Sequence, residues 1–150
     1  MMRYNRANNF IQADVDDFIK VSEERMIALM QQSIQDVVNE AQQSRFKGGR
    51  MRVDTGFLRS TGAHSIGSLP SGPTARPRGE AKIPNSYDWD SGPLGVTLSK
   101  LKFGDVFFFG WTADYAEVRE VYDGFLAGAL QNWARIVAFN TDTLRNRIKK

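Results

Sequence analysis

The sequence predicts an α+β fold in which a long N-terminal helix and a C-terminal helix pack on one side of a small antiparallel sheet. Three observations support this prediction. Apolar residues recur at three- and four-residue steps in the first and last parts of the chain. Residues 48–95 contain all five prolines and nine of the thirteen glycines, which disfavours regular structure there. Two short apolar segments around Gly104-Asp105 have the pattern of a β-hairpin.

The composition is that of one globular domain. The chain has 150 residues, of which 41% are hydrophobic and 25% charged, both close to globular averages. It has no cysteine, which excludes disulfides, thiolate catalysis and thiolate zinc sites and fits a reducing compartment. No apolar run approaches the roughly 20 residues of a membrane-spanning helix, and acids follow the N-terminus where a signal peptide would be apolar. We therefore expect a soluble, non-exported protein with no membrane partner.

The first predicted element is a long amphipathic helix from Ala13 to about Ser44, after a flexible N-terminus over residues 1–12. Asp14 is expected to cap its first amides, and Gly48-Gly49 to end it. Met26 and Met30 belong to its apolar stripe, where packing in the core is favoured over a binding role. The stripe consists of Val15, Phe18, Ile19, Met26, Leu29, Met30, Ile34, Val37, Val38 and Ala41.

The second part, residues 65–95, is predicted to be a mobile loop or insertion. Its segment 67-GSLPSGPTARPRGEAKIP-84 offers almost no apolar residues to anchor it. Arg76, Arg78 and Lys82 in this segment could contact phosphates. A solvated loop is the preferred interpretation, because no aromatic residue is interleaved for base stacking.

The sheet is predicted from 95-GVTLSKLKF-103, a strand with an irregularity, and 106-VFFFGW-111, a more buried strand. The run Phe107, Phe108 and Phe109 places aromatic side chains on both faces of its strand. Either both faces are covered, or one face is free for a partner chain. The last element is a helix from about Asp123, with a basic C-terminal turn that complements its dipole. Its apolar residues at helical spacing include Leu126, Leu130, Trp133, Val137, Leu144 and Ile148.

The net charge of +3 hides alternating blocks of opposite sign. Residues 14–40 carry seven acids against two bases, a net −5, and residues 45–82 carry eight bases against two acids, a net +6. Residues 83–134 come to −4 and residues 135–150 to +4. A monomeric nucleic-acid binder usually gathers one sign on one face, whereas alternating blocks suit a protein that contacts copies of itself. We therefore favour self-association.

The segment 52-RVDTGFLRST-61 contains Asp-Thr-Gly, the catalytic tripeptide of aspartic proteases. Such an enzyme needs two of these carboxylates sharing a proton, and one copy would require dimerisation about the active site. Asp54 follows Arg50-Met51-Arg52 rather than a buried strand, and Phe57 occupies a position that is small in those proteases. The preferred interpretation is an Asx-type turn or N-cap at Asp54, completed by Thr55 and Gly56.

The other candidate catalytic patterns are weaker. His64 has no cysteine, second histidine or close acid beside it in the sequence, and Asp88 and Asp90 are two carboxylates separated by a tryptophan. Gly92-Pro93-Leu94-Gly95 is unlike a phosphate-binding loop, because proline removes a donor and no Lys-Ser/Thr follows. We expect no catalytic, cofactor or metal site, and hence not an enzyme.

Three segments together resemble the head–tail neck proteins of long-tailed phages, also called minor tail or tail-completion proteins. They are 53-VDTGFLRST-61, 115-YAEVRE-120 and 124-GFLAGALQNWARIV-137. The residues that match the first two motifs of that family are Thr55, Gly56, Leu58, Arg59, Tyr115, Ala116 and Glu117 or Glu120. Phe125, Leu126 and Ala129 match the motif that opens the last helix.

The resemblance implies a structural virion protein that completes the joint between the capsid portal and the tail tube. It implies assembly in the host cytoplasm as a ring, with a hexamer as a common form, no cofactor, and portal, adaptor and tail-tube proteins as partners. Genomic DNA would pass through the channel. Candidate interface residues are Phe107, Phe108, Phe109, Trp111, Tyr115, Glu117 and Glu120. Candidate basic residues on assembly surfaces or facing the channel are Arg50, Arg52, Arg59, Arg76 and Arg78.

Two alternatives stay open at this stage. Within the same assembly, a tail terminator is hardly separable from a tail-completion protein by sequence. From another class, a basic nucleic-acid-binding module would use the +6 segment as its phosphate contact, and its affinity for DNA would fall steeply with salt.

Overall fold

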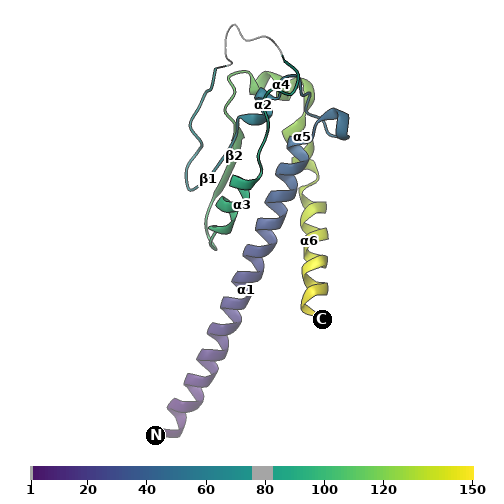
Figure 1. Cartoon of the computed structure of the whole chain (residues 1–150). Helices are drawn as coiled ribbons and strands as arrows, with labels where there is room; N and C mark the ends of the chain where they lie inside the picture. Colours follow the sequence, from purple (N-terminus) through teal and green to yellow (C-terminus); the bar gives the residue numbers. More distant parts are fainter. Residues whose placement is uncertain (1, 76–82) are drawn as a thin grey trace.

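The computed structural model describes residues 2–75 and 83–150, with side chains described from Gln12 onward, and has the predicted α+β fold (Figure 1). In Figure 1 the longest helix, α1, has the sheet and α3 on one side and α6 on the other. The elements in chain order are α1 (Met2–Gln42), the short 3₁₀ helix η1 (Arg45–Lys47), α2 (Phe57–Ser60), β1 (Gly62–Ile66), α3 (Gly92–Ser99), β2 (Phe107–Trp111), α4 (Ala116–Asp123), α5 (Phe125–Gln131) and α6 (Trp133–Ile148).

The long N-terminal helix is confirmed, but it begins earlier than predicted. α1 has 41 residues and is therefore about 60 Å long at 1.5 Å per residue. Asp14 lies inside the helix, so the prediction that Asp14 caps it was wrong; the helical pattern simply continues toward Met2. At the other end the chain turns back through η1, where Gly48 adopts the left-handed φ of 86° and Gly49 N donates to Ser44 O at 2.8 Å.

The sheet has two antiparallel strands, with residue pairs running from Gly62 opposite Trp111 to Ile66 opposite Phe107. The strand predicted over 106–111 is thus confirmed as β2. Its partner was predicted wrongly, because β1 comes from far earlier in the chain. Residues 95–99 of the segment predicted as the other strand of a hairpin belong to α3 instead.

The helical character of α3 follows from its apolar spacing. Leu94, Leu98 and Leu101 are separated by four and three residues and are all buried, whereas Val96 is 59% exposed. Pro93 lies in the first turn of the helix, where its missing N–H costs nothing. The strand was predicted because Val96 and Leu98 alternate with polar residues, which treats Val96 as buried. The three- and four-residue spacing of the leucines is the pattern that fits the structure.

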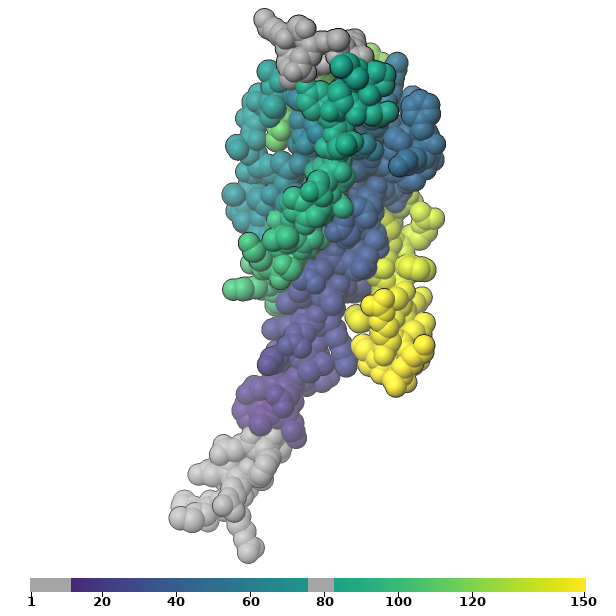
Figure 2. Space-filling view, viewed as in Figure 1, coloured from purple at the N-terminus to yellow at the C-terminus, as the bar shows by residue number. Residues whose placement is uncertain are grey.

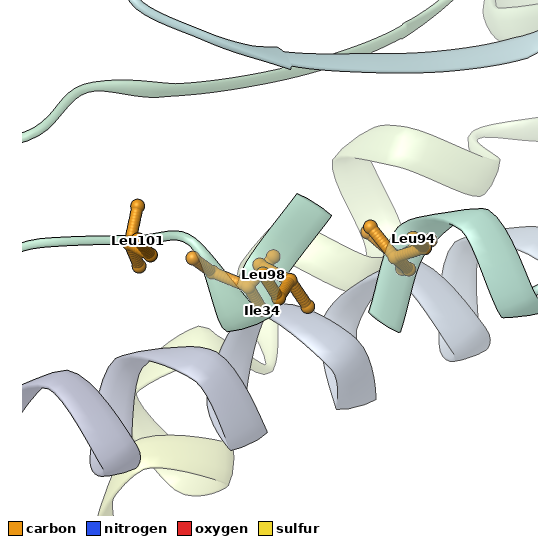
Figure 3. Packing of buried hydrophobic residues seen from close by; sticks show 5 residues of the cluster. Ile34, Leu94, Leu98 and Leu101 are labelled. Atoms are coloured by element: carbon orange, nitrogen blue, oxygen red, sulfur yellow. The ribbon is translucent and has the colours of Figure 1, made fainter. Parts of the chain in front are cut away.

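One core cluster lies where α3 meets α1 and the sheet (Figure 3). Ile34 and Val38 of α1 pack with Leu94, Leu98 and Leu101, and Phe107 and Phe109 of β2 are partly buried against this cluster. Full burial of each such aliphatic side chain contributes about 1.5–3 kcal/mol. A two-stranded sheet is marginal by itself in water, so this packing is what stabilises β1 and β2.

A second core cluster lies under α2 and α5. It consists of Met51, Phe57, Leu58, Ala113 and Phe125. A row of edge-to-face aromatic contacts connects the two clusters: Trp89 with Phe109, Phe109 with Trp111, and Trp111 with Phe125 at 4.7 Å between centroids. The aromatic residues of β2 therefore hold the two halves of the domain together.

The predicted C-terminal helix is present as separate helices, and a further helix, α4, precedes it. Gly124 ends α4 with a left-handed φ of 61° and donates to Glu120 O at 2.8 Å. Asn132 then separates α5 from α6. α6 runs back along α1, where Asn140 Nδ2 donates to Ser33 Oγ at 3.3 Å and to Asp36 Oδ2 at 2.8 Å.

Parts of the predicted loop 65–95 are anchored to the rest of the domain. Thr74 N donates to Thr112 O at 2.5 Å, and Thr74 O accepts from Asp114 N at 3.0 Å. After residues 76–82, which lie outside the described residues together with Arg76 and Arg78, Tyr87 N donates to Thr55 O at 2.9 Å. The chain is thus attached to the domain on both sides of residues 76–82.

Candidate functional site

The Asp-Thr-Gly motif forms the turn that begins α2. Thr55 Oγ1 accepts from Phe57 N at 3.3 Å, so the turn-stabilising oxygen is that of Thr55 and not that of Asp54. Asp54 is exposed and uses its main-chain carbonyl, which accepts from Asn85 N at 3.0 Å. Gly56 has a φ of 86°, and a Cβ placed there would lie 2.1 Å from Tyr87 O. The motif is a structural joint between residues 54–57 and 85–87.

A small pocket of about 160 Å³ lies beside this turn, lined by Arg52, Arg59 and Arg119 together with Tyr115. Leu58 in its wall is buried in the second core cluster. Within the part of the chain that the structure describes, the Arg59 Nε atom is buried without a hydrogen-bond partner. Guanidinium groups favour planar anions, so this pocket could hold one carboxylate.

A buried carboxylate, Asp123, joins three segments next to this pocket. Its side chain is 1% exposed, and its oxygens accept from Arg119 Nη2 at 2.6 Å, Arg45 Nη2 at 3.1 Å and Arg52 N at 3.2 Å. Burial by itself raises the pKa of Asp123, but the hydrogen bonds from Arg119 and the Arg52 amide, with the charges of Arg119 and Arg45, lower the pKa overall. Sequence reasoning missed this residue, because nothing local marks a carboxylate whose partners are up to 78 residues away.

The aromatic residues predicted at a subunit interface lie largely within the domain. Phe107 and Phe109 pack against the first core cluster, and Trp111 Nε1 donates to Gln42 Oε1 at 2.9 Å. Phe108 projects to the opposite face of β2, because side chains alternate along a strand. A partner contact at Phe108 stays a prediction.

Tyr115, just before α4, and Glu117 and Glu120 in α4 were predicted to lie at an interface. Two of them make contacts within the domain and one is exposed. Tyr115 packs against Phe57 with ring centroids 6.2 Å apart. Glu120 accepts from Leu126 N at 2.9 Å and from Ala127 N at 2.8 Å, so its carboxylate satisfies amides at the start of α5. Glu117 is exposed in the first turn of α4 and is available to a partner.

Of the predicted basic residues that the structure describes, Arg52 and Arg59 line the same small pocket, whereas Arg50 makes other contacts. Arg50 Nη1 lies 3.8 Å from Glu40 Oε1, and its guanidinium covers Gly128 so closely that a Cβ there would lie 2.1 Å from Nη1. Arg52 is exposed, and Arg59 lines the small pocket described above. Phe46, which the sequence reading did not single out, is 93% exposed between Arg45 and Lys47.

Other exposed apolar side chains lie on α1, α4 and α5. Between Val15 and Met30, every stripe residue of α1 except the half-buried Leu29 is exposed: Phe18 is 73% exposed, Met26 53% and Met30 40%. The prediction that Met26 and Met30 pack in the core was wrong, because the rest of the domain packs only on the C-terminal half of α1. On α4 the exposed apolar side chains are Val118, Val121 and Tyr122, and on α5 they are Leu126 and Leu130.

Comparison with known proteins gave no match: no family model, curated protein or solved structure is similar to this chain at a significant level. Among the described residues, no three histidine, cysteine or acidic side chains are grouped so that they could hold a metal ion. None of the described helices combines the length and apolar character needed to span a membrane.

His64 supplies a pH-dependent term in stability. It lies in β1 opposite Phe109, and burial lowers its pKa below the ordinary value of 6.5. The unfolded chain therefore takes up the proton first, and the free energy of unfolding falls as pH decreases below about 6.5. We expect the free energy of unfolding of His64→Gln, measured by urea denaturation, to depend less on pH between pH 7 and 5 than that of the wild type. The difference in slope should be less than about 1.4 kcal/mol per pH unit, which is the limit for one proton. An unchanged slope would contradict this assignment.

Proposed function

We propose that this protein is a structural component of a phage head–tail connector, which completes the joint between the portal and the tail tube as a ring. The observation that carries the proposal is the large apolar surface of α1 that its own chain leaves uncovered, from Val15 to Met30. Apolar patches of this kind on a soluble protein indicate contacts with other chains.

The three motifs that suggested a neck protein also fit this proposal. Thr55 and Gly56 form the turn into α2, and Glu120 holds the start of α5 after the left-handed Gly124. These residues therefore hold turns and helix ends in place, a role that fits a structural protein. Alternating charge blocks can align neighbouring subunits, because complementary charge mainly sets orientation and register.

The proposal is tested by the solution mass, measured by light scattering over a range of protein concentrations at low and moderate salt. We expect a closed mass of more than two chains that does not grow further with concentration, and a ring with a central opening by electron microscopy. A ring needs two different complementary patches on each chain. A strict monomer or dimer at every concentration would contradict the proposal.

A basic nucleic-acid-binding module is the second candidate, favoured by the exposed Phe46 ring between Arg45 and Lys47. An aromatic ring flanked by cations suits base stacking and phosphate contact. This function predicts a monomer or dimer whose DNA affinity falls linearly with salt on logarithmic axes. Weak DNA binding by a protein that forms a ring would reject the nucleic-acid-binding function.

Binding to isolated portal complexes or to tail tubes would separate tail completion from tail termination.

A further inference from the structure

The N-terminal half of α1 extends beyond the helix that covers it. Asn140 of α6 is level with Ser33 and Asp36 of α1, and the two helices run in opposite directions. At 1.5 Å per residue, the end of α6 at Ile148 is level with about residue 26 of α1. Residues 12–21 are all exposed, and Figure 2 shows α1 projecting past the rest of the molecule.

The exposed part of α1 has an apolar stripe on one face. Val15, Phe18 and Ile19 follow one another at steps of three and four residues with Met26, which places them on one side of the helix. Continued at 100° per residue, this side reaches Ser33, which contacts Asn140 of α6. The stripe therefore continues the α6-facing surface of α1 past the end of α6.

The same chain offers a groove of about 630 Å³ between α1, α3 and α6. Leu98 forms part of its α3 wall, and Phe139 and Leu144 form part of its α6 wall. Phe139 is 69% exposed, so the groove has an uncovered apolar edge. Arg147 lines the groove toward the C-terminal end of α6.

Charge selects between the possible occupants of the groove. Residues 12–24 carry five acids against Lys20, a net −4, so two such segments side by side would repel each other. Residues 141–150 at the end of α6 carry four bases against Asp142, a net +3. An acidic helix with an apolar stripe thus matches a groove that has apolar residues on its α3 and α6 walls and a basic end, while glutamines and Asp36 line its α1 wall.

We propose that residues 12–26 of α1 in one copy bind in the groove between α1, α3 and α6 of a second copy. The apolar stripe packs on Phe139 and Leu144, and the acidic flank lies next to the basic end of α6. Stripe and groove are different surfaces of the same chain, so the contact repeats head to tail and closes a ring when the rotation allows. In this respect the inference rests on the proposed ring function and names its subunit contact.

The test uses the absence of cysteine, which leaves any introduced cysteine as the only thiol. Phe18→Cys and Thr143→Cys chains are prepared separately, mixed and oxidised. Each variant chain carries a single thiol, so every disulfide joins two chains. It forms only where the Cα atoms of the two positions can approach within about 7 Å. The matched control replaces Phe18→Cys by Lys20→Cys, an exposed position on the opposite face of α1.

We expect the Phe18→Cys and Thr143→Cys mixture to cross-link at least about ten-fold faster than the Lys20→Cys mixture, because only the former pair approaches disulfide geometry. Cross-linking within the Phe18→Cys preparation alone would indicate pairing of two α1 helices and overturn the proposal. Equal rates in both mixtures would also overturn it.

A second variant connects the contact to assembly. Phe18→Asp should convert the assembled mass to monomer, whereas Ala13→Asp, with the same added charge on the opposite face, should leave it unchanged. Phe18 is 73% exposed, so both variants should unfold like the wild type. The two experiments together separate the contact from the ring. If Phe18→Asp still forms a ring and the cross-linking is not selective, the proposed contact is wrong but the ring function is not.

If the cross-linking is selective but the protein is only a dimer, the contact is supported and the ring is rejected. A monomer without cross-links would reject both.

Discussion

Replacement of Asp123 by asparagine should lower the free energy of unfolding by about 2–3 kcal/mol. Breaking a buried ion pair by removing one partner costs about 3–5 kcal/mol, because the remaining charge stays desolvated. The cost here falls below that range, because Arg45 and Arg119 are 53% and 27% exposed and regain water. The loss should also include the Arg52 amide, which donates to the same carboxylate. Urea denaturation at pH 7 measures it.

The matched control is Asp142→Asn. Asp142 forms an ion pair with Arg145 at 3.7 Å, but both side chains are well exposed, and such pairs contribute about 0–1 kcal/mol. The pH profile gives a second check. Because the folded-state pKa of Asp123 is lowered, its stabilisation is present above the unfolded pKa and lost as pH falls through the folded one. Asp123→Asn should lack this acid-dependent loss. Equal stability of the two variants at pH 7 would refute the role of Asp123.

The fold class could be predicted because its strongest signals are local. The period of α1, the apolar run of β2 and the spacing of the C-terminal helices are each contained within one segment. The pairing of β2 was predicted wrongly for the same reason. A glycine-aspartate turn next to two apolar runs favours a hairpin, but β1 pairs with β2 across more than 40 residues of chain. Only tertiary packing on α3 and α1 selects that partner.

The sequence allowed the turn at the candidate site to be predicted, but not which side chains around it are exposed. The Asp-Thr-Gly segment was taken as a turn, and it forms one, but the choice of Thr55 over Asp54 as acceptor depends on local geometry. Burial was misjudged along α1. Met26 and Met30 were assigned to the core because an apolar stripe does not reveal where its partner helix ends. The internal contacts of Phe109 and Trp111 could not be predicted, because their partners Trp89 and Phe125 are distant in sequence.

Substitution of Gly56 by alanine should be the most damaging single change in the turn, with a loss of more than about 4 kcal/mol or failure to fold. The left-handed φ of 86° alone costs a residue with a Cβ about 1–2 kcal/mol. The larger part is steric, because the new Cβ would lie 2.1 Å from Tyr87 O, a main-chain atom. Tyr87 N donates to Thr55 O at 2.9 Å, so relief of the contact would break the joint between the two segments.

Gly48→Ala isolates the steric part of this prediction. Gly48 has the same φ of 86°, but a Cβ there meets nothing within 4 Å. It should therefore lose only the left-handed penalty of about 1–2 kcal/mol. The difference between the two variants in urea denaturation measures how tightly residues 85–87 are held against the turn. If Gly56→Ala were no less stable than Gly48→Ala, the close packing of Tyr87 on the turn would be refuted, and with it the interpretation of the motif as a joint and not a site.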